Sequence, residues 1–125
     1  MSAGKVLVVD DEPEVRQVLL EFLTGRGYEV SAAAGGAEAL DIVETIRPNL
    51  VLLDVAMPGM DGVETLKRIV AVDPSLAVIM VTANADIGVT SKLLALGAVD
   101  YVPKPFDLDY LDQAVSIQVL AAQDH

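Results

Sequence analysis

Acidic side chains and one lysine stand in the sequence where they could form a single reactive site. Asp10 and Asp11 follow one apolar run, Asp54 follows another, and Thr82 and Lys104 follow two more. Clustered carboxylates repel one another and are costly to remove from water, so such a cluster persists where a cation neutralises it. Oxygen ligands with one or two direct carboxylates favour Mg²⁺, which keeps several of its waters. With an ammonium and a hydroxyl on the opposite wall, the site would suit a phosphoryl group.

The elements that must bring these residues together are predicted by alternating apolar runs and amphipathic stretches. We expect strands at 5–9, 28–33, 50–53, 77–81 and 99–102, and helices from Pro13 to the glycines 25 and 27 and at 36–46, 62–72, 87–96 and 107–122, the last capped by Asp107. Continuous β-branched runs are typical of parallel strands buried on both faces, and strands that alternate with helices predict an α/β fold. We therefore expect one doubly wound (βα)5 domain over residues 1–125, flavodoxin-like, with a parallel five-stranded sheet in the order 2-1-3-4-5.

This strand order predicts where the site lies. Strands one and three are neighbours in it, and ligands of such sheets bind beyond the carboxyl ends of the strands, where the order reverses. Asp10, Asp11 and Asp54 are therefore expected to meet in one crevice.

Composition excludes several classes of function. The 125 residues are the usual size of one domain, and 19 Asp and Glu against 8 Lys and Arg give a net charge of −11. That charge argues against direct binding of nucleic acid or of an anionic membrane, because phosphate groups require a basic surface. With no cysteine, and with His125 as the single histidine, disulfides, thiolate sites and histidine-based catalysis are excluded. No apolar stretch suits a signal peptide or a membrane span, so we expect a soluble cytoplasmic protein.

Four motifs follow in order, each at the end of an expected strand: VVDDE, LLDVAMPGMDG, VTA and YVPKPF. Together they resemble the receiver domain of two-component response regulators, the chemotaxis-type receiver. The resemblance implies a phosphorelay protein in which Asp54 accepts a phosphoryl group from a phosphohistidine of a sensor histidine kinase or phosphotransfer protein. It also implies a regulatory domain whose only chemistry is its own phosphorylation and dephosphorylation, and not an enzyme.

The resemblance further implies a Mg²⁺ site. Asp11 and Asp54 would bind the ion directly, and the backbone carbonyl of Ala56 would be the third protein ligand. Asp10 would act through a bound water.

On the opposite wall, the resemblance implies that Lys104 pairs with the phosphoryl oxygens and that Thr82 hydrogen-bonds one of them. A cis peptide bond before Pro105 would orient the lysine. Tyr101 matches an aromatic position whose ring swings inward when Thr82 moves towards the phosphate. Phosphate and Mg²⁺ would thereby shift the 82–106 region to an active state.

Two positions beside the pocket depart from the usual pattern of the family. Ala56 is small where many relatives carry a longer or polar side chain, and Asn84 replaces a residue that is often charged. An alanine leaves the approach to the phosphorus open, and an asparagine can orient a water. We expect hydrolysis of the Asp54 phosphate to be sensitive to both positions.

The face formed by residues 87–122 is where receivers usually signal to an effector domain or protein. Its last helix has no Arg or Lys, which argues against the salt-bridged dimer of the winged-helix regulators. Val89, Leu93 and Leu94 are expected to expose apolar surface, which leaves open another phosphorylation-dependent homodimer or a partner protein. The sequence also leaves open the cognate kinase, the response, and whether the chain stands alone or belongs to a longer regulator or hybrid kinase.

Several of these residues have structural alternatives. Asp11 or Glu12 could cap the first helix, and Tyr101 could be a half-buried packing residue. Met57, Met60 and Met80 are expected to fill gaps in the core.

Other functions fit the residues less well. A haloacid-dehalogenase-like aspartyl-phosphate phosphatase needs a second acid where this chain has Ala56. A flavodoxin-like cofactor binder needs a first loop rich in Ser, Thr and Gly to hold phosphate. A degenerate receiver that acts only as a protein–protein interaction module would usually have lost Asp54 or Lys104.

Overall fold

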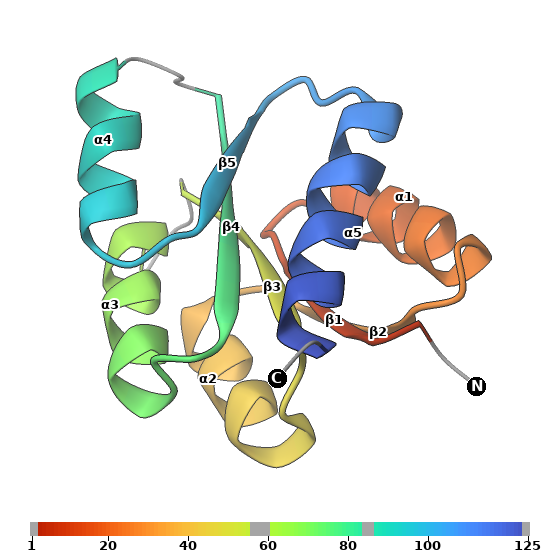
Figure 1. Ribbon diagram of the computed structural model, residues 1–125, viewed down its shortest axis with the longest axis horizontal. Coiled ribbons are helices and arrows are strands. Elements are labelled where there is room, and N and C mark those ends of the chain that lie inside the picture. Colours follow the sequence, from red (N-terminus) through yellow and green to blue (C-terminus); the bar gives the residue numbers. More distant parts are fainter. Residues whose placement is uncertain (1–2, 56–60, 84–86, 124–125) are drawn as a thin grey trace.

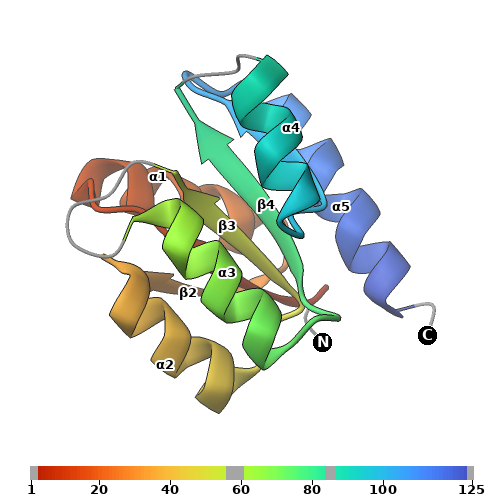
Figure 2. The same cartoon turned by 90° about the vertical axis from the view of Figure 1, so that its left-hand side faces the viewer.

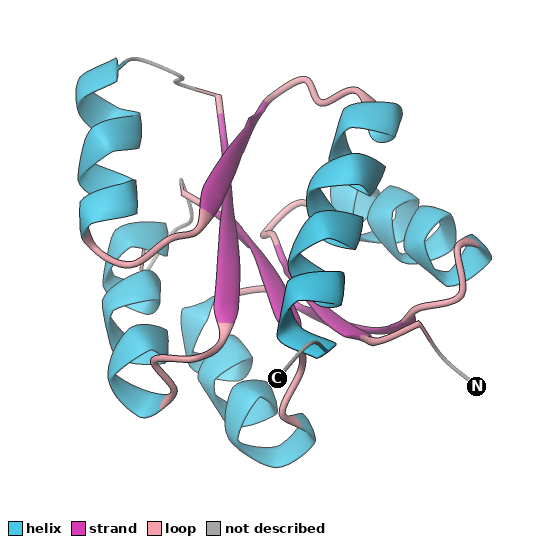
Figure 3. Ribbon diagram, viewed as in Figure 1, coloured by secondary structure: helices cyan, strands magenta, loops and turns pink. Residues whose placement is uncertain are grey.

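The computed structural model describes residues 3–55, 61–83 and 87–123. Strands and helices alternate along the chain (Figures 1 and 3). The strands are β1 (Lys5–Val9), β2 (Glu29–Ala33), β3 (Leu50–Asp54), β4 (Ala77–Thr82) and β5 (Asp100–Pro103). The helices are α1 (Pro13–Gly25), α2 (Gly36–Ile46), α3 (Gly62–Val72), α4 (Ile87–Ala95) and α5 (Leu108–Gln123).

The strands form one parallel sheet in the order β2-β1-β3-β4-β5. Helices α1 and α5 cover one face of the sheet, and α2, α3 and α4 cover the other (Figures 1 and 2). The predicted doubly wound (βα)5 fold and its strand order are confirmed.

Both faces of the sheet are buried, which explains the continuous apolar runs. In β1, Val6 and Val8 pack in the layer with α1 and α5, while Leu7 and Val9 pack in the layer with α2, α3 and α4. Alternate residues of a strand point to opposite faces, so each face needs its own row of apolar side chains. Met80 in β4 is fully buried in the second layer, as predicted.

Strand ends differ slightly from the sequence prediction, and the difference involves the site. β3 continues one residue past its apolar run, because Asp54 pairs with Val81. β4 likewise continues to Thr82, which pairs with Pro103. Backbone pairing between strands does not depend on whether the side chain is apolar, so these two polar residues belong to the sheet and share its rigidity.

The apolar surface of α4 is smaller than the sequence predicts. Leu93 is only 1% exposed and packs in the core, and Val89 is partly buried against the same layer. Leu94 is 44% exposed. The prediction of exposed surface at Leu93 is wrong, because α4 lays that side chain onto the sheet and turns the next one outward.

Helix α5 starts one residue after its predicted first residue. Asp107 is its cap, as predicted, since Oδ1 of Asp107 accepts a hydrogen bond from the N–H of Asp109 at 2.8 Å. Among the helices of the described residues, none has the length and apolar character needed to cross a membrane.

Candidate phosphoryl-binding site

The carboxyl ends of β1 and β3 bring two of the predicted acids together. The strands pair with Val9 opposite Leu53, so Asp10 and Asp54 occupy adjacent positions at one edge of the sheet. Both are buried, with 1% of Asp10 and 4% of Asp54 exposed. Two buried carboxylates so placed need a cation beside them.

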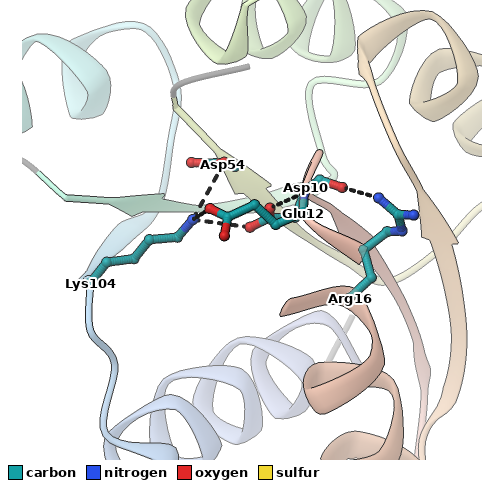
Figure 4. Close-up of polar contacts among 5 residues, drawn as sticks. All are labelled: Asp10, Glu12, Arg16, Asp54 and Lys104. Carbon is teal, nitrogen blue, oxygen red and sulfur yellow. Dashed lines mark hydrogen bonds and ion pairs between the residues drawn. The ribbon is translucent and has the colours of Figure 1, made fainter. Parts of the chain in front are cut away.

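Lys104 supplies that cation, as Figure 4 shows. Its Nζ lies 3.1 Å from Oδ2 of Asp10, 3.4 Å from Oδ2 of Asp54 and 3.9 Å from Oε1 of Glu12. The backbone N–H of Lys104 donates to the carbonyl of Thr82 at 2.7 Å, which extends the β4–β5 pairing by one residue. The sheet therefore holds the main chain of the lysine next to the two acids.

The acids also influence the protonation of Lys104. Burial acts to lower the pKa of its ammonium, but the hydrogen bond and charge of Asp10, together with those of Asp54, outweigh burial and raise the pKa above its ordinary value. Lys104 is thus a cation at neutral pH, positioned to attract an anion that approaches Asp54.

A pocket of ≈ 380 Å³ adjoins these residues. It is lined by acidic, hydroxyl, cationic and apolar side chains: Glu12, Asp54, Val55, Thr82, Ala83, Val89 and Lys104. Thr82 is 2% exposed at the end of β4. The structure thus brings Asp54, Thr82 and Lys104 to one pocket, where a carboxylate, a hydroxyl and an ammonium can act on the same bound group.

The acids that follow β1 fit a hard metal ion. One carboxylate oxygen from each of Asp10, Asp11 and Glu12 lies within 4.8 Å of the others. Asp54 adjoins this group, because Lys104 contacts both Asp10 and Asp54. An all-oxygen donor set at the mouth of a pocket fits Mg²⁺, which prefers oxygen ligands and keeps several of its waters.

The remaining predicted residues fall into three groups. Four of them lie outside the described residues: Ala56, Met57, Met60 and Asn84. Tyr101 lies on β5, is half-buried and packs against the core layer of α2, α3 and α4. The peptide bond between Lys104 and Pro105 is cis.

The start of α1 shows how Asp10 is held. Glu12 is the N-cap residue of α1 but makes no side-chain capping bond, so the capping alternative for Glu12 is wrong. Instead, the N–H of Glu12 donates to Oδ1 of Asp10 at 2.9 Å. The helix start and the buried acid are therefore joined directly.

Three residues that contribute to the site were not predicted as site residues from the sequence. Glu12 joins the acid group, and its position directly after two aspartates was a usable signal. Arg16 donates from Nη1 to the carbonyl oxygen of Asp10 at 2.8 Å (Figure 4). Gly62 lies so close to the chain after Asp54 that an added Cβ would stand 2.6 Å from Cα of Val55. The pattern shows that a glycine follows the acidic strand end but gives no sign of this close approach.

The five-stranded parallel sheet and the polar pocket at the carboxyl ends of its strands are typical of an α/β domain that binds a ligand at this position. Comparison with known proteins identifies its family. The model of the response regulator receiver domain matches residues 6–116. The chain therefore belongs to the receiver domains of two-component response regulators.

Individual relatives agree with this assignment. The chain is 44% identical over 115 residues to sporulation initiation phosphotransferase F of Bacillus subtilis, covering 92% of this chain and 93% of that protein. It is 41% identical over 120 residues to the DNA-binding transcriptional regulator NtrC of Klebsiella pneumoniae, of which it covers 26%. The CheY-like receiver domain protein of Methanospirillum hungatei superposes with a TM-score of 0.91 at 30% identity, covering 96% of both chains.

Proposed function

We propose that this chain is a phospho-acceptor switch in which Asp54 takes a phosphoryl group from a sensor histidine kinase or a phosphotransfer protein. An oxygen of Asp54 attacks the phosphorus, the P–N bond of the donor phosphohistidine breaks, and the imidazole leaves with the electron pair. The observation that carries the proposal is the Lys104 ammonium, 3.4 Å from Oδ2 of Asp54 at a pocket of ≈ 380 Å³. The name of the Bacillus subtilis relative, a phosphotransferase, supports it.

The acids fit a resident Mg²⁺, and receiver domains generally bind this ion at an acidic pocket. Asp11 and Asp54 would hold it directly with the carbonyl of Ala56, and Asp10 would hold it through a water. When bound, Mg²⁺ supplies positive charge to the phosphoryl oxygens. Lys104 neutralises further charge on those oxygens, and the Thr82 hydroxyl donates a hydrogen bond to one of them.

Phosphorylation would act by population shift. Thr82 is drawn towards the phosphoryl group, and the ring of Tyr101 then turns inward, so the 82–106 region favours its active arrangement. With beryllofluoride and Mg²⁺, the backbone NMR signals of Thr82 and Tyr101 should shift more than those of β2. Shifts confined to Asp10 and Asp11 would contradict the switch.

Loss of the phosphate would depend on Ala56 and Asn84, which each stand two residues after a site residue in the sequence, Asp54 and Thr82. Water attacks the phosphorus and the Asp54 carboxylate leaves, so access and orientation of water decide the rate. We expect Ala56→Arg to lengthen the phosphate lifetime by closing the approach, and Asn84→Glu to change it by repelling or reorienting water. Unchanged lifetimes in both variants would contradict this proposal.

Partners follow from the family. Receiver domains interact with histidine kinases or phosphotransfer proteins and with effector domains. We propose that residues 1–125 form one receiver domain in the cytoplasm, that the 87–122 face carries the output, and that the phosphorylated form pairs through a homodimer. Light scattering with and without beryllofluoride tests the last point.

Labelling of Asp54 tests the proposed function. The folded chain is incubated with phosphoramidate and MgCl₂, and intact mass spectrometry measures the gain of one phosphoryl group. Wild type and the control Asp41→Asn, an exposed acid of α2, should gain it, whereas Asp54→Asn and EDTA-treated wild type should not. No gain in folded wild type, or an equal gain in Asp54→Asn, would overturn the proposal.

A further inference from the structure

Arg16 reaches from α1 to the acid site without entering the pocket. Its Nη1 donates to the backbone carbonyl oxygen of Asp10 at 2.8 Å, and its side chain is partly buried (Figure 4). Side chains of a helix lean towards its N-terminus, so an arginine near the start of α1 points back to the end of β1. Its guanidinium thereby contacts the peptide group that joins Asp10 to Asp11.

The carbonyl of Asp10 depends on such a donor. Asp10 is 1% exposed, so water reaches its main chain poorly. A buried carbonyl without a donor is costly, and a bond from a permanently charged guanidinium is stronger than one between neutral groups. Arg16 therefore supplies a hydrogen bond that this buried carbonyl requires.

The other contacts of Asp10 hold different parts of the residue. Its N–H donates to the carbonyl of Ala33 at 3.1 Å. Its carboxylate accepts bonds from the N–H of Glu12 at 2.9 Å and from Nζ of Lys104 at 3.1 Å. Of these described contacts, the bond from Arg16 is the one made to the peptide plane that joins Asp10 to Asp11.

We propose that Arg16 is a positioning residue: by holding the Asp10 carbonyl it fixes the Asp10–Asp11 peptide, and so keeps the Asp11 carboxylate directed at the divalent cation. This inference rests on the proposed function, since it concerns the Mg²⁺ that the phosphorylation step requires. Hydrogen bonds behind a metal ligand commonly change metal affinity by 10-fold or more when they are removed.

The positive charge of Arg16 has the opposite effect on cation binding. A guanidinium near the acids repels a divalent cation, so a role through charge alone predicts tighter Mg²⁺ binding when the arginine is removed. A positioning role predicts weaker binding. The two roles therefore differ in sign. Lysine separates them further, because it keeps the charge but its side chain is one atom shorter, so its ammonium falls short of the Asp10 carbonyl that Nη1 of Arg16 reaches.

The test is the dissociation constant of MgCl₂ measured by NMR titration of the unphosphorylated full chain. We expect Arg16→Met to weaken Mg²⁺ binding about 10-fold and Arg16→Lys to weaken it in the same direction. Without Mg²⁺, the backbone order parameter of the Asp11 amide should fall in Arg16→Met. The control is Arg26→Met, which removes the same charge from the far end of α1, where Arg26 lies 3.6 Å from Asp112; it should leave both readouts unchanged.

The outcomes separate this inference from the proposed function. Unchanged or tighter Mg²⁺ binding in Arg16→Met, or wild-type affinity in Arg16→Lys, would overturn the positioning role. If Arg16→Met does not fold, Arg16→Lys decides alone. A wild-type chain that binds Mg²⁺ but is not phosphorylated on Asp54 would overturn the proposed function and leave the role of Arg16 standing.

Discussion

Replacing Lys104 by methionine should destabilise the metal-free protein and make its stability depend strongly on Mg²⁺. The lysine lies 3.1 Å from the carboxylate of Asp10 and 3.4 Å from that of Asp54. Methionine keeps the apolar length of the side chain and removes the charge. Two buried carboxylates then face each other without the ammonium between them.

The expected size of the effect follows from these distances. With an effective dielectric constant of 20, each contact is worth about 5 kcal/mol before the loss of hydration is subtracted. Removing one partner from a buried ion pair costs about 3–5 kcal/mol. The Lys104 side chain is 18% exposed, which places it at the lower end, about 3 kcal/mol. For a domain of this size that is a fall of about 10 °C in the melting temperature.

The pH dependence has a definite sign. The pKa of Lys104 is raised in the folded protein, so its contribution is fully present below the unfolded pKa of about 10.4 and is lost as pH rises through the folded value. The difference in unfolding free energy between wild type and Lys104→Met should therefore be constant near neutral pH. It should shrink only in strongly alkaline solution, above about pH 10.4.

Urea unfolding followed by circular dichroism measures these quantities, with Lys67→Met, an exposed lysine of α3, as the matched control. Saturating MgCl₂ should raise the stability of Lys104→Met more than that of wild type, because the ion replaces the missing charge. A ligand at 100 times its dissociation constant adds about 2.7 kcal/mol. The reasoning is refuted if Lys104→Met and Lys67→Met unfold at the same urea concentration. It is also refuted if Mg²⁺ stabilises wild type and both variants equally.

Three other substitutions test the framework around the site, all by urea unfolding. Gly62→Ala should destabilise the chain by about 3 kcal/mol or more, since the new Cβ would stand 2.6 Å from Cα of Val55; a loss below about 1 kcal/mol would show that the loop yields. Asp107→Ala should cost about 1 kcal/mol through loss of the cap on α5, and an unchanged midpoint would contradict that role. Leu93→Ala should cost about 2–5 kcal/mol, whereas Leu94→Ala, exposed on the same helix, should stay within about 0.5 kcal/mol; equal losses would contradict the orientation of α4.

The fold was predictable because its local and global signals agree. Each buried strand is a continuous apolar run and each helix an amphipathic one, and a strict alternation of the two leaves few topologies. The predicted strand order makes β1 and β3 neighbours, and it therefore also predicted that Asp10 and Asp54 lie side by side at the carboxyl ends of these strands. The strand ends were less predictable, because pairing at Asp54 and Thr82 is a property of the backbone.

Contacts between elements were the part that the pattern could not supply. The orientation of Leu93 depends on how α4 is rotated about its axis, and a short helix with apolar residues on several sides fits more than one rotation. The bond from Arg16 to the carbonyl of Asp10 involves a backbone atom, which leaves no trace in the residue types. Hydrogen bonds from side chains to main-chain groups can therefore be identified only in the folded structure and not from the sequence pattern.

The two layers of the core differ in how far apart their parts lie along the chain. The buried residues of the layer with α2, α3 and α4 run from Leu7 to Ala98, whereas the other layer also includes α5 at the end of the chain. In that layer the Tyr28 hydroxyl lies 3.3 Å from Oγ of Ser116, a residue 88 positions away. Contacts of long sequence separation form late, because closing a long loop costs entropy before any contact repays it. During synthesis, the part of this face that α5 covers therefore stays open to water until residues 108–123 have left the ribosome. A nascent chain of this protein is therefore exposed to aggregation at that place until α5 has packed against the sheet.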